Sequence, residues 1–333
     1  MKHDLIIKGG KLVTANETFA ADIGVKDGRI ATLGENLDGN DVINADNKLV
    51  MPGGIEAHCH IAQESANGIM TSDDYETGSI SAAFGGNSCF VPFAAQKKGE
   101  SIATTIAEYD RRAETKSVID YSYHLILTDP NKEVLDELPS AFERGITSFK
   151  VFMTYATRVS DAQFLDILTI ARRHGGLTMV HAENHDMLSW MSNALTQGGY
   201  TEPRYHAPAR PSLAEEEAIN RAISLSKLAN APLMIVHVST PKGAELVARA
   251  RMDGAFVFGE TCPQYLFLTR DDIDRPDLEG AKYICSPPLR DVSTQEALWR
   301  HIAGGTFSVV SSDHAPYRFD ESGKFSNGRD VDF

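Results

Sequence analysis

The sequence lacks paired cysteines and long apolar runs, and both absences exclude classes of protein. Its four cysteines, Cys59, Cys89, Cys262 and Cys285, are too far apart to form a CxxC pair, which argues against a structural zinc knot or a dithiol redox motif. Dispersed cysteines and an N-terminus without a secretory signal predict a reducing compartment, the cytoplasm. No apolar run approaches the roughly 20 residues of a membrane-spanning helix.

Positive charge is also scarce. Lys and Arg number 32 against 46 Asp and Glu, which gives a net charge of -14 and a pI near 5.2. Phosphate backbones and anionic membrane surfaces repel such a chain, so neither nucleic acid nor a membrane is an expected partner. Hydrophobic residues make up 42% of the 333 positions, which is ample for the core of one large barrel or of two ordinary domains.

The first 50 residues are built differently from the rest. They contain the short β-type runs DLIIKGGKLVTA and ADIGVKDGRIATLG, broken by Gly-Gly and Asp-Gly. These dipeptides between β-type runs are typical of hairpins. We therefore predict a small β-domain, or part of one, at residues 1–50.

From Met51 the pattern changes to strands that alternate with helices. Strands are expected at 52–58, 87–94, 118–127, 147–153, 177–182, 232–238, 255–260 and 306–312. Helices are expected at 101–116, 161–176 and 213–230, the last with Ser212 as its N-cap. Eight such units predict an α/β fold with a closed (β/α)₈ barrel over residues 51–333. No helix is expected after the eighth strand, so the barrel is predicted to be truncated at its C-terminal end.

Histidines stand at the ends of several expected strands. GIEAHCHIA contains His58 and His60, which point the same way from a strand because they are two residues apart. This pair alone is a weak signal. His181, His237 and Asp313 stand at the ends of strands five, six and eight, and in such a barrel these ends form the catalytic mouth. Four histidines and an aspartate there predict a site for zinc-type metals.

A lysine interrupts the fourth expected strand. Lys150 lies in TSFKVFMTY, where an ammonium is costly unless something compensates it. Buried lysines lose their proton readily, and carbon dioxide would convert the neutral amine into a carbamate able to bridge two metals. The alternative is a lysine that extends its charge to the barrel mouth.

These residues and several longer segments resemble the hydantoinase/dihydropyrimidinase family of the binuclear-metal amidohydrolases. The segments are MPGGIEAHCH, FKVFMTY, VHAEN, GETCPQYL, EGAKYICSPPLR and SDHAP, and the similarity runs across essentially the whole chain. The resemblance implies a TIM-type barrel flanked by a β-sandwich made from both chain ends, assembled as a homotetramer. It implies two divalent ions, expected to be Zn²⁺, with this ligand set: His58, His60 and Asp313 for the more buried ion, His181 and His237 for the other, and carbamylated Lys150 between them.

The same resemblance implies a reaction. A hydroxide bridging the metals would attack a ring carbonyl of a cyclic ureide, either a 5,6-dihydropyrimidine or a 5-substituted hydantoin. Tyr155 matches the tyrosine that stabilises the oxyanion, and Ser286 matches a position whose backbone contacts the cyclic amide. Asp313 would carry the proton from the hydroxide to the leaving ring nitrogen. The product would be an N-carbamoyl amino acid.

Two alternatives stand beside this interpretation. One is an allantoinase- or dihydroorotase-type cyclic amidase, against which Tyr155 argues. The other is a non-catalytic dihydropyrimidinase-like assembly protein, against which the six ligand-type residues argue. The segment 62–70 lacks the apolar loop that often frames the substrate, so the physiological ring and the preferred enantiomer stay open. The family's substrate-contacting Asn has no counterpart before Phe333, and we expect the C-terminal half of the sandwich to be absent.

Overall fold

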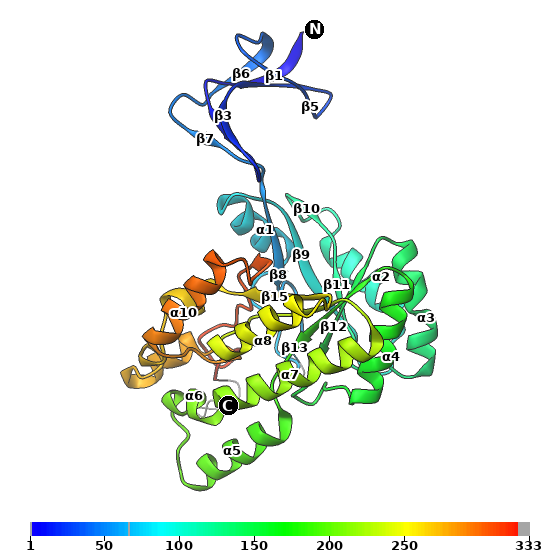
Figure 1. Ribbon diagram of the computed structural model, residues 1–333, viewed down its shortest axis with the longest axis vertical. Coiled ribbons are helices and arrows are strands. Elements are labelled where there is room, and N and C mark those ends of the chain that lie inside the picture. Colours follow the sequence, from blue (N-terminus) through cyan, green and yellow to red (C-terminus); the bar gives the residue numbers. More distant parts are fainter. Residues whose placement is uncertain (1, 66, 326–333) are drawn as a thin grey trace. The chain divides into compact units, whose positions relative to one another are not determined.

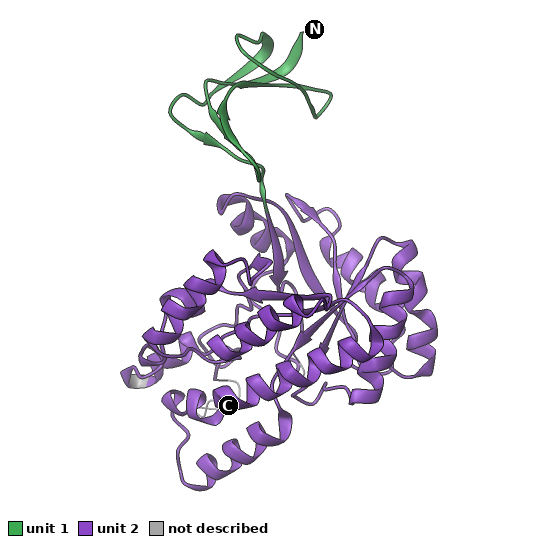
Figure 2. Cartoon of the chain, viewed as in Figure 1, with its two compact units in different colours: residues 1–54 green, residues 55–333 purple. Residues whose placement is uncertain are grey.

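The computed structural model describes residues 2–65 and 67–325. The chain divides into two compact units, residues 1–54 and 55–333 (Figure 2). Among the described residues, no helix has both the length and the apolar character needed to cross a bilayer.

The first unit consists of two small sheets. One sheet has the order β5-β4-β1-β6, formed by β5 (Arg29–Gly34), β4 (Asp22–Lys26), β1 (His3–Lys8) and β6 (Gly39–Asn44). The other has the order β3-β2-β7, formed by β3 (Thr18–Ala20), β2 (Lys11–Val13) and β7 (Leu49–Val50).

Only one of the two predicted hairpins is present. Asp27 and Gly28, both at positive φ, join the antiparallel strands β4 and β5, as expected for an Asp-Gly turn. The Gly9–Gly10 hairpin prediction is wrong, because this step carries the chain from one sheet to the other. A Cβ on Gly9 would lie 1.9 Å from a carboxylate oxygen of Asp46. The close approach, rather than a hairpin, therefore explains this glycine.

The second unit contains the nearly closed barrel that the sequence predicts (Figure 1). Its wall consists of β8 (Gly54–Cys59), β9 (Asn87–Ala95), β11 (His124–Ile126), β12 (Ser148–Phe152), β13 (Leu177–His181), β14 (Leu233–Ile235), β15 (Val257–Thr261) and β16 (Val309–Val310). Neighbouring strands from β9 round to β16 pair in parallel. A parallel bridge between Cys59 and His314 brings the two ends of the wall together.

Helices surround these strands (Figure 1). They are α1 (Tyr75–Phe84), α2 (Ile102–Ala113), α3 (Lys132–Glu143), α4 (Asp161–Arg173), α5 (His185–Gln197), α6 (His206–Ala209), α7 (Ser212–Ala229), α8 (Pro241–Met252), α9 (Pro263–Phe267) and α10 (Val292–Ala303). Short 3₁₀ turns cover Pro203–Tyr205, Arg270–Asp272 and Pro276–Tyr283.

Local signals explain where the predicted elements differ from the observed ones. The third strand is split, since β10 (Asp120–Tyr121) and β11 pair with different parts of β9. Helix α4 ends at Arg173 because Gly175 takes φ 75°, a conformation that ends helices. The prediction of Ser212 as an N-cap is wrong: Pro211 occupies that position, and Ser212 is already helical.

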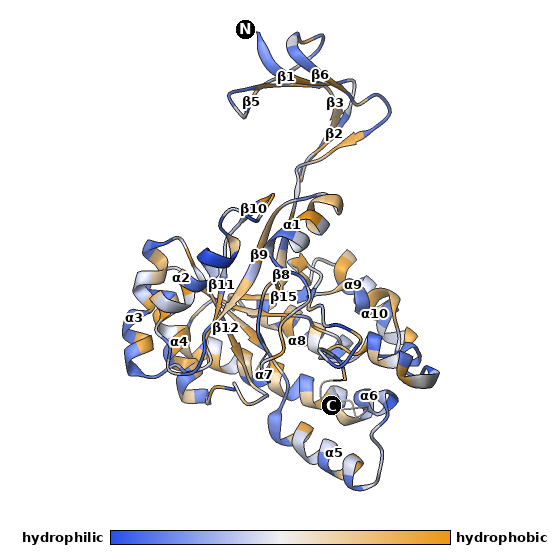
Figure 3. Cartoon of the chain, turned by 180° about the vertical axis from the view of Figure 1, so that it is seen from behind, coloured by the Kyte–Doolittle hydropathy of each residue, from blue (hydrophilic) through white to orange (hydrophobic). Residues whose placement is uncertain are grey.

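The core has two layers because side chains alternate along each strand. In β12, Phe149 and Val151 pack in the large cluster shared with the helices. Lys150, between them, lies beside the ring of Phe93 instead. Phe93 belongs to a small inner cluster, which also contains Ile126, Met179 and Val236. The lysine therefore points into the barrel interior. In Figure 3 the hydrophobic colour marks the strands and also stretches of the helices around them.

Candidate metal centre and active site

The predicted ligands stand at or just beyond the carboxyl ends of barrel strands. They are His58 and His60 from β8, Lys150 from β12, His181 from β13, His237 after β14 and Asp313 after β16. The carboxyl ends of parallel strands share one edge of a barrel, where its active sites are built. Five strands thus deliver these side chains to one mouth.

The first three ligand-type side chains converge on one point. Ligand atoms of His58, His60 and Asp313 lie within 4.8 Å of one another, and in residues 2–65 and 67–325 no other group of three His, Cys, Asp or Glu does so. Oδ1 of Asp313 lies 3.0 Å from Nε2 of His58 and 3.2 Å from Nε2 of His60. Nε2 of His58 is buried and makes no hydrogen bond to the described residues. Two imidazole nitrogens aimed at one carboxylate oxygen fit a cation between them.

The other ring nitrogens of these histidines are held by acceptors. Nδ1 of His58 donates to Oε1 of Glu260 at 2.6 Å. Nδ1 of His60 lies 2.7 Å from Oε1 of Gln63. A proton fixed on Nδ1 leaves the lone pair on Nε2, which is the arrangement that a metal-binding histidine needs.

His181 and His237 form a second pair beside the first. Their ring centres are 4.5 Å apart, and the rings of His58 and His237 are 5.6 Å apart. Nε2 of His181 donates to Oε2 of Glu183 at 2.7 Å, which leaves its Nδ1 free of a proton. Nδ1 of His237 is buried without a partner among the described residues. These nitrogens suit a second cation, and the donor set fits two ions.

Glu260 connects the two pairs, although no role was predicted for it from the sequence. The same oxygen that holds His58 lies 3.3 Å from the backbone nitrogen of His237. Glu260 is fully buried in β15. A charged side chain in an apolar barrel strand is the signal that singled out Lys150, and the same reasoning could have found Glu260 in GETCPQYL.

Lys150 is 1% exposed and lies between aromatic rings. Its Nζ is 4.9 Å from the ring centre of Phe93 and 5.4 Å from that of Phe152. Burial lowers the pKa of Lys150 to about 8, although the Asp313 and Glu260 carboxylates act in the opposite direction. With 1% of Lys150 exposed, its ammonium does not extend into solvent at the barrel mouth.

Tyr155 lies at the mouth beside the second histidine pair. Its ring centre is 5.1 Å from that of His181. Burial raises the pKa of the phenol, against the opposing effect of the Arg210 guanidinium. The phenol therefore stays protonated and can donate a hydrogen bond.

Three of the predicted site residues have left-handed backbone conformations. Tyr155 has φ 70°, His237 has φ 40° and Asp313 has φ 49°. Such conformations are unfavourable for residues other than glycine, and they gather where function requires a fixed geometry. Aspartate and histidine adopt positive φ more often than most residues, but residue type alone does not predict it at these three positions.

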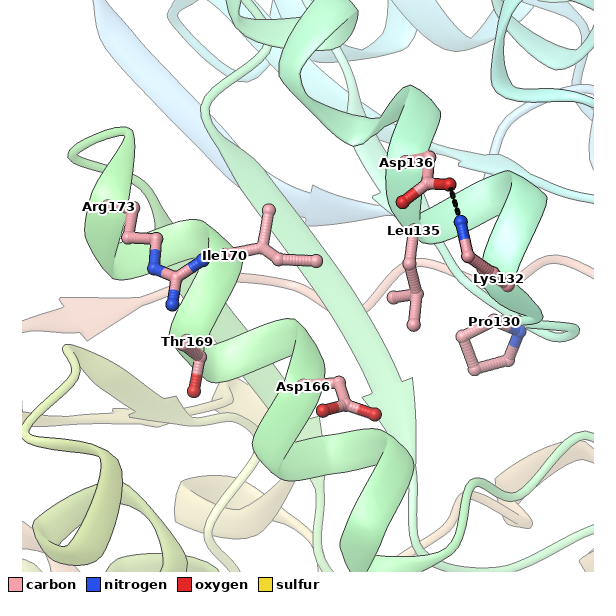
Figure 4. Close-up of a pocket in the computed structure, with 8 residues that line it drawn as sticks. All are labelled: Pro130, Lys132, Leu135, Asp136, Asp166, Thr169, Ile170 and Arg173. Atoms are coloured by element: carbon pink, nitrogen blue, oxygen red, sulfur yellow. Dashed lines mark hydrogen bonds and ion pairs between the residues drawn. The ribbon is translucent and has the colours of Figure 1, made fainter.

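A surface hollow lies apart from this site. It has a volume of about 490 Å³ between α3 and α4, and its lining includes Lys132, Asp136 and Arg173 (Figure 4). Lys132 and Asp136 pair with each other across one helical turn. None of the predicted site residues lines this hollow.

No family model matches the chain, but individual proteins are similar to it. It is 42% identical over 319 residues to a D-hydantoinase of Geobacillus stearothermophilus, over 94% of this chain and 68% of that protein. A D-hydantoinase of Rhizobium radiobacter is 42% identical over 320 residues, covering 95% and 70%. The crystal structure of a dihydropyrimidinase from Brevibacillus agri has a TM-score of 0.94 at 42% identity, covering 99% and 71%.

Proposed function

The chain belongs to the hydantoinase/dihydropyrimidinase family, and from that premise we propose how its site opens a cyclic ureide ring by hydrolysis. The substrates are 5,6-dihydropyrimidines or 5-substituted hydantoins, and the products are N-carbamoyl amino acids. The similar proteins do not favour an allantoinase, a dihydroorotase or a non-catalytic assembly protein. The convergence of His58, His60 and Asp313 at the barrel mouth is the observation that carries this proposal.

Six side chains would hold two divalent ions, with Zn²⁺ the proposed metal. His58, His60 and Asp313 would hold one ion, His181 and His237 the other, and a carbamate on Lys150 would contact both. Two such ions supply hydroxide near neutral pH by lowering the pKa of water. Lys150 is buried beside Phe93, whose ring packs against His58 and His60. It also lies beside Phe152, whose ring packs against His181, and this position supports its role as the shared ligand.

Asp313 would move the proton. Its carboxylate is anchored near both His58 and His60, and 12% of its side chain is exposed at the mouth. A carboxylate held this way is positioned to take a proton from the attacking water and return it to the leaving ring nitrogen. The C–N bond of the ring breaks as that nitrogen is protonated.

Tyr155 and Ser286 would bind the reacting amide. The protonated phenol donates to the oxygen that becomes negative as the carbonyl is attacked, and one such donor is worth about 3 kcal/mol in other enzymes. The backbone of Ser286 would contact the cyclic amide. The 5.1 Å separation of the Tyr155 and His181 rings supports a role for Tyr155 beside the second histidine pair.

We also propose that the enzyme works in the cytoplasm as a homotetramer. All four cysteines are free, which suits a reducing compartment. In the first unit, Ile30, Leu33 and Val42 are more than half exposed, which supports the proposal that these strands are half of a β-sandwich. Light scattering on the purified protein tests the assembly, and a mass of one 36.4 kDa chain would contradict it.

Ring opening is the direct test of the activity. The zinc-loaded chain is incubated with dihydrouracil and with a 5-substituted hydantoin, and N-carbamoyl products are measured by chromatography. His58→Ala is expected to abolish product formation. His174→Ala is the matched control, because His174 is exposed after α4 and should not affect the rate. Failure of the zinc-loaded chain to open either ring would contradict the proposal.

A further inference from the structure

A continuous set of buried contacts joins Tyr155 to His181. The guanidinium carbon of Arg210 lies 5.2 Å from the ring centre of Tyr155. Nη1 of the same guanidinium donates to Oε2 of Glu183. That oxygen also accepts the proton of Nε2 of His181. One carboxylate oxygen thus binds both the arginine and the histidine.

Burying the ion pair of Arg210 and Glu183 costs free energy. Arg210 is 4% exposed and Glu183 is 1% exposed. Nε of Arg210 and Oε1 of Glu183 are buried without hydrogen-bond partners among the described residues. Buried ion pairs of this kind are often no more stabilising than apolar side chains of similar volume. Stability alone therefore does not explain why the pair is here.

A second buried pair fixes the position of Arg210. Nη1 of Arg290 donates to the backbone carbonyl of Arg210 at 2.7 Å. Nη2 of Arg290 lies 3.3 Å from Oε2 of Glu215. Glu215 is 1% exposed and accepts a hydrogen bond from the backbone of Ser239 at 2.8 Å. The guanidinium of Arg210 therefore extends from an anchored backbone.

We propose that Arg210 and Glu183 are positioning residues that orient Tyr155 and His181 together. This inference rests on the proposed function. Glu183 holds the proton of His181 on Nε2 and so presents Nδ1 to the metal. The guanidinium of Arg210 pairs with Glu183 and also lies over the phenol ring of Tyr155, so it supports both side chains.

The chemistry of arginine explains why this residue type is needed. A guanidinium is planar and stays charged, so it can pair with a carboxylate and lie against an aromatic ring at once. A lysine has one compact ammonium and cannot do both. Tyr155 has a left-handed backbone at φ 70°, which persists only where surrounding groups hold it. Arg210 is one of those groups.

Two variants separate the two ends of this set of contacts. Arg210→Lys keeps a positive charge near Glu183 but removes the guanidinium that lies over the ring of Tyr155. We expect kcat to fall about 10- to 100-fold, with KM and zinc content little changed. Glu183→Gln removes the carboxylate from His181. We expect the affinity of the second site for zinc to fall about 10- to 100-fold. This affinity is measured by titrating the metal-free chain with zinc alone in bicarbonate.

Arg204→Lys is the matched control. Arg204 pairs with Glu202 on the surface, where its side chain is 47% exposed. The change is chemically identical to Arg210→Lys, and it should alter neither kcat nor zinc affinity. Circular dichroism checks that each variant is folded. If one of the two variants fails to fold, the other still tests its own part of the proposal.

The outcomes distinguish this inference from the proposed function. An unmodified chain that opens no cyclic ureide contradicts the function, while the zinc titration of Glu183→Gln still tests the orientation of His181. An active chain whose Arg210→Lys variant keeps the unmodified kcat contradicts the role of Arg210. Unmodified zinc affinity in Glu183→Gln contradicts the role of Glu183.

Discussion

At the scale of single residues, a charged side chain buried in this barrel needs neighbouring groups that compensate its charge. Lys150 is buried among aromatic rings, and a cation–π contact offers only about 1–2 kcal/mol. Removing an ammonium from water costs several kcal/mol. The nearby Asp313 and Glu260 carboxylates compensate part of this cost. A lysine in this position is therefore better explained as part of the metal site than as a packing residue.

Replacing Lys150 tests that explanation. Lys150→Ala should lower bound zinc below that of the unmodified chain and abolish ureide hydrolysis, because the shared ligand is removed. Zinc per chain is measured by atomic absorption and activity by product formation. Lys227→Ala is the control, since Lys227 is exposed on α7 and pairs with Asp253. Unchanged zinc and activity in Lys150→Ala would exclude a two-metal site built on this residue.

Glu260 gives a second prediction at this scale. Glu260→Gln keeps the shape but removes the charge that holds the Nδ1 proton of His58, so zinc affinity should fall about 10- to 100-fold. Competition with a zinc-binding dye measures this affinity. Glu279→Gln, a surface residue paired with Lys282, should show no change. Equal affinities for both variants would show that Glu260 does not orient His58.

The lowered pKa of His206 leads to a prediction of how stability depends on pH. It is buried and donates to the carbonyl of Cys285 at 2.8 Å, and burial lowers its pKa from 6.5 to about 3. As the pH falls below 6.5, His206 binds a proton in the unfolded chain but stays neutral in the folded chain. The stabilisation due to the neutral form is thus complete above pH 6.5 and is lost between pH 6.5 and about 3.

The slope of the unfolding free energy against pH measures this effect. His206→Gln should reduce the slope below pH 6.5 by about 1.4 kcal/mol per pH unit, the value for one proton. Urea unfolding of the metal-free chain at pH 6.5 and pH 5 gives the slope. His301→Gln is the comparison variant, and it should keep the unmodified slope. A similar slope in His206→Gln would contradict the prediction.

At the scale of elements, the sequence predicts the barrel wall well. All eight barrel strands lie where alternating strand and helix signals place them, because each parallel strand is an apolar run between polar turns. The strand ends also position the six ligand-type residues. Their partners were not predictable in the same way: His58 and Glu260 are 202 residues apart. Such pairings depend on how the barrel closes, which no local pattern encodes.

Helix caps supply a stability prediction at this scale. Ser160 accepts from the backbone of Gln163, whose side chain returns a bond to Ser160, and together they form a capping box at the start of α4. Ser160→Ala should lower the unfolding free energy by about 1 kcal/mol. Ser224→Ala, at an exposed position within α7, should be nearly neutral. Urea unfolding of both variants compares them, and equal stabilities would contradict the role of the cap.

At the scale of the whole molecule, the ligand-type side chains lie at one edge of the barrel, and the rest of the chain supports their positions. Residues that lie 255 positions apart along the chain meet at one mouth, as the 3.0 Å approach of His58 to Asp313 shows. The proposed hydroxide chemistry would depend on two cations, whereas the orientation of each ligand would depend on buried acceptors of this chain. The metal content of the protein therefore tests the proposed chemistry most directly.

Native mass spectrometry of the chain, after loading with zinc in bicarbonate, is the most direct measurement of that content. It reads the subunit mass and the bound species together. We predict two zinc ions per chain and the added mass of one carbamate, with less zinc and no carbamate in Lys150→Ala. A chain that stays free of metal and carbamate under these conditions would contradict the central claim.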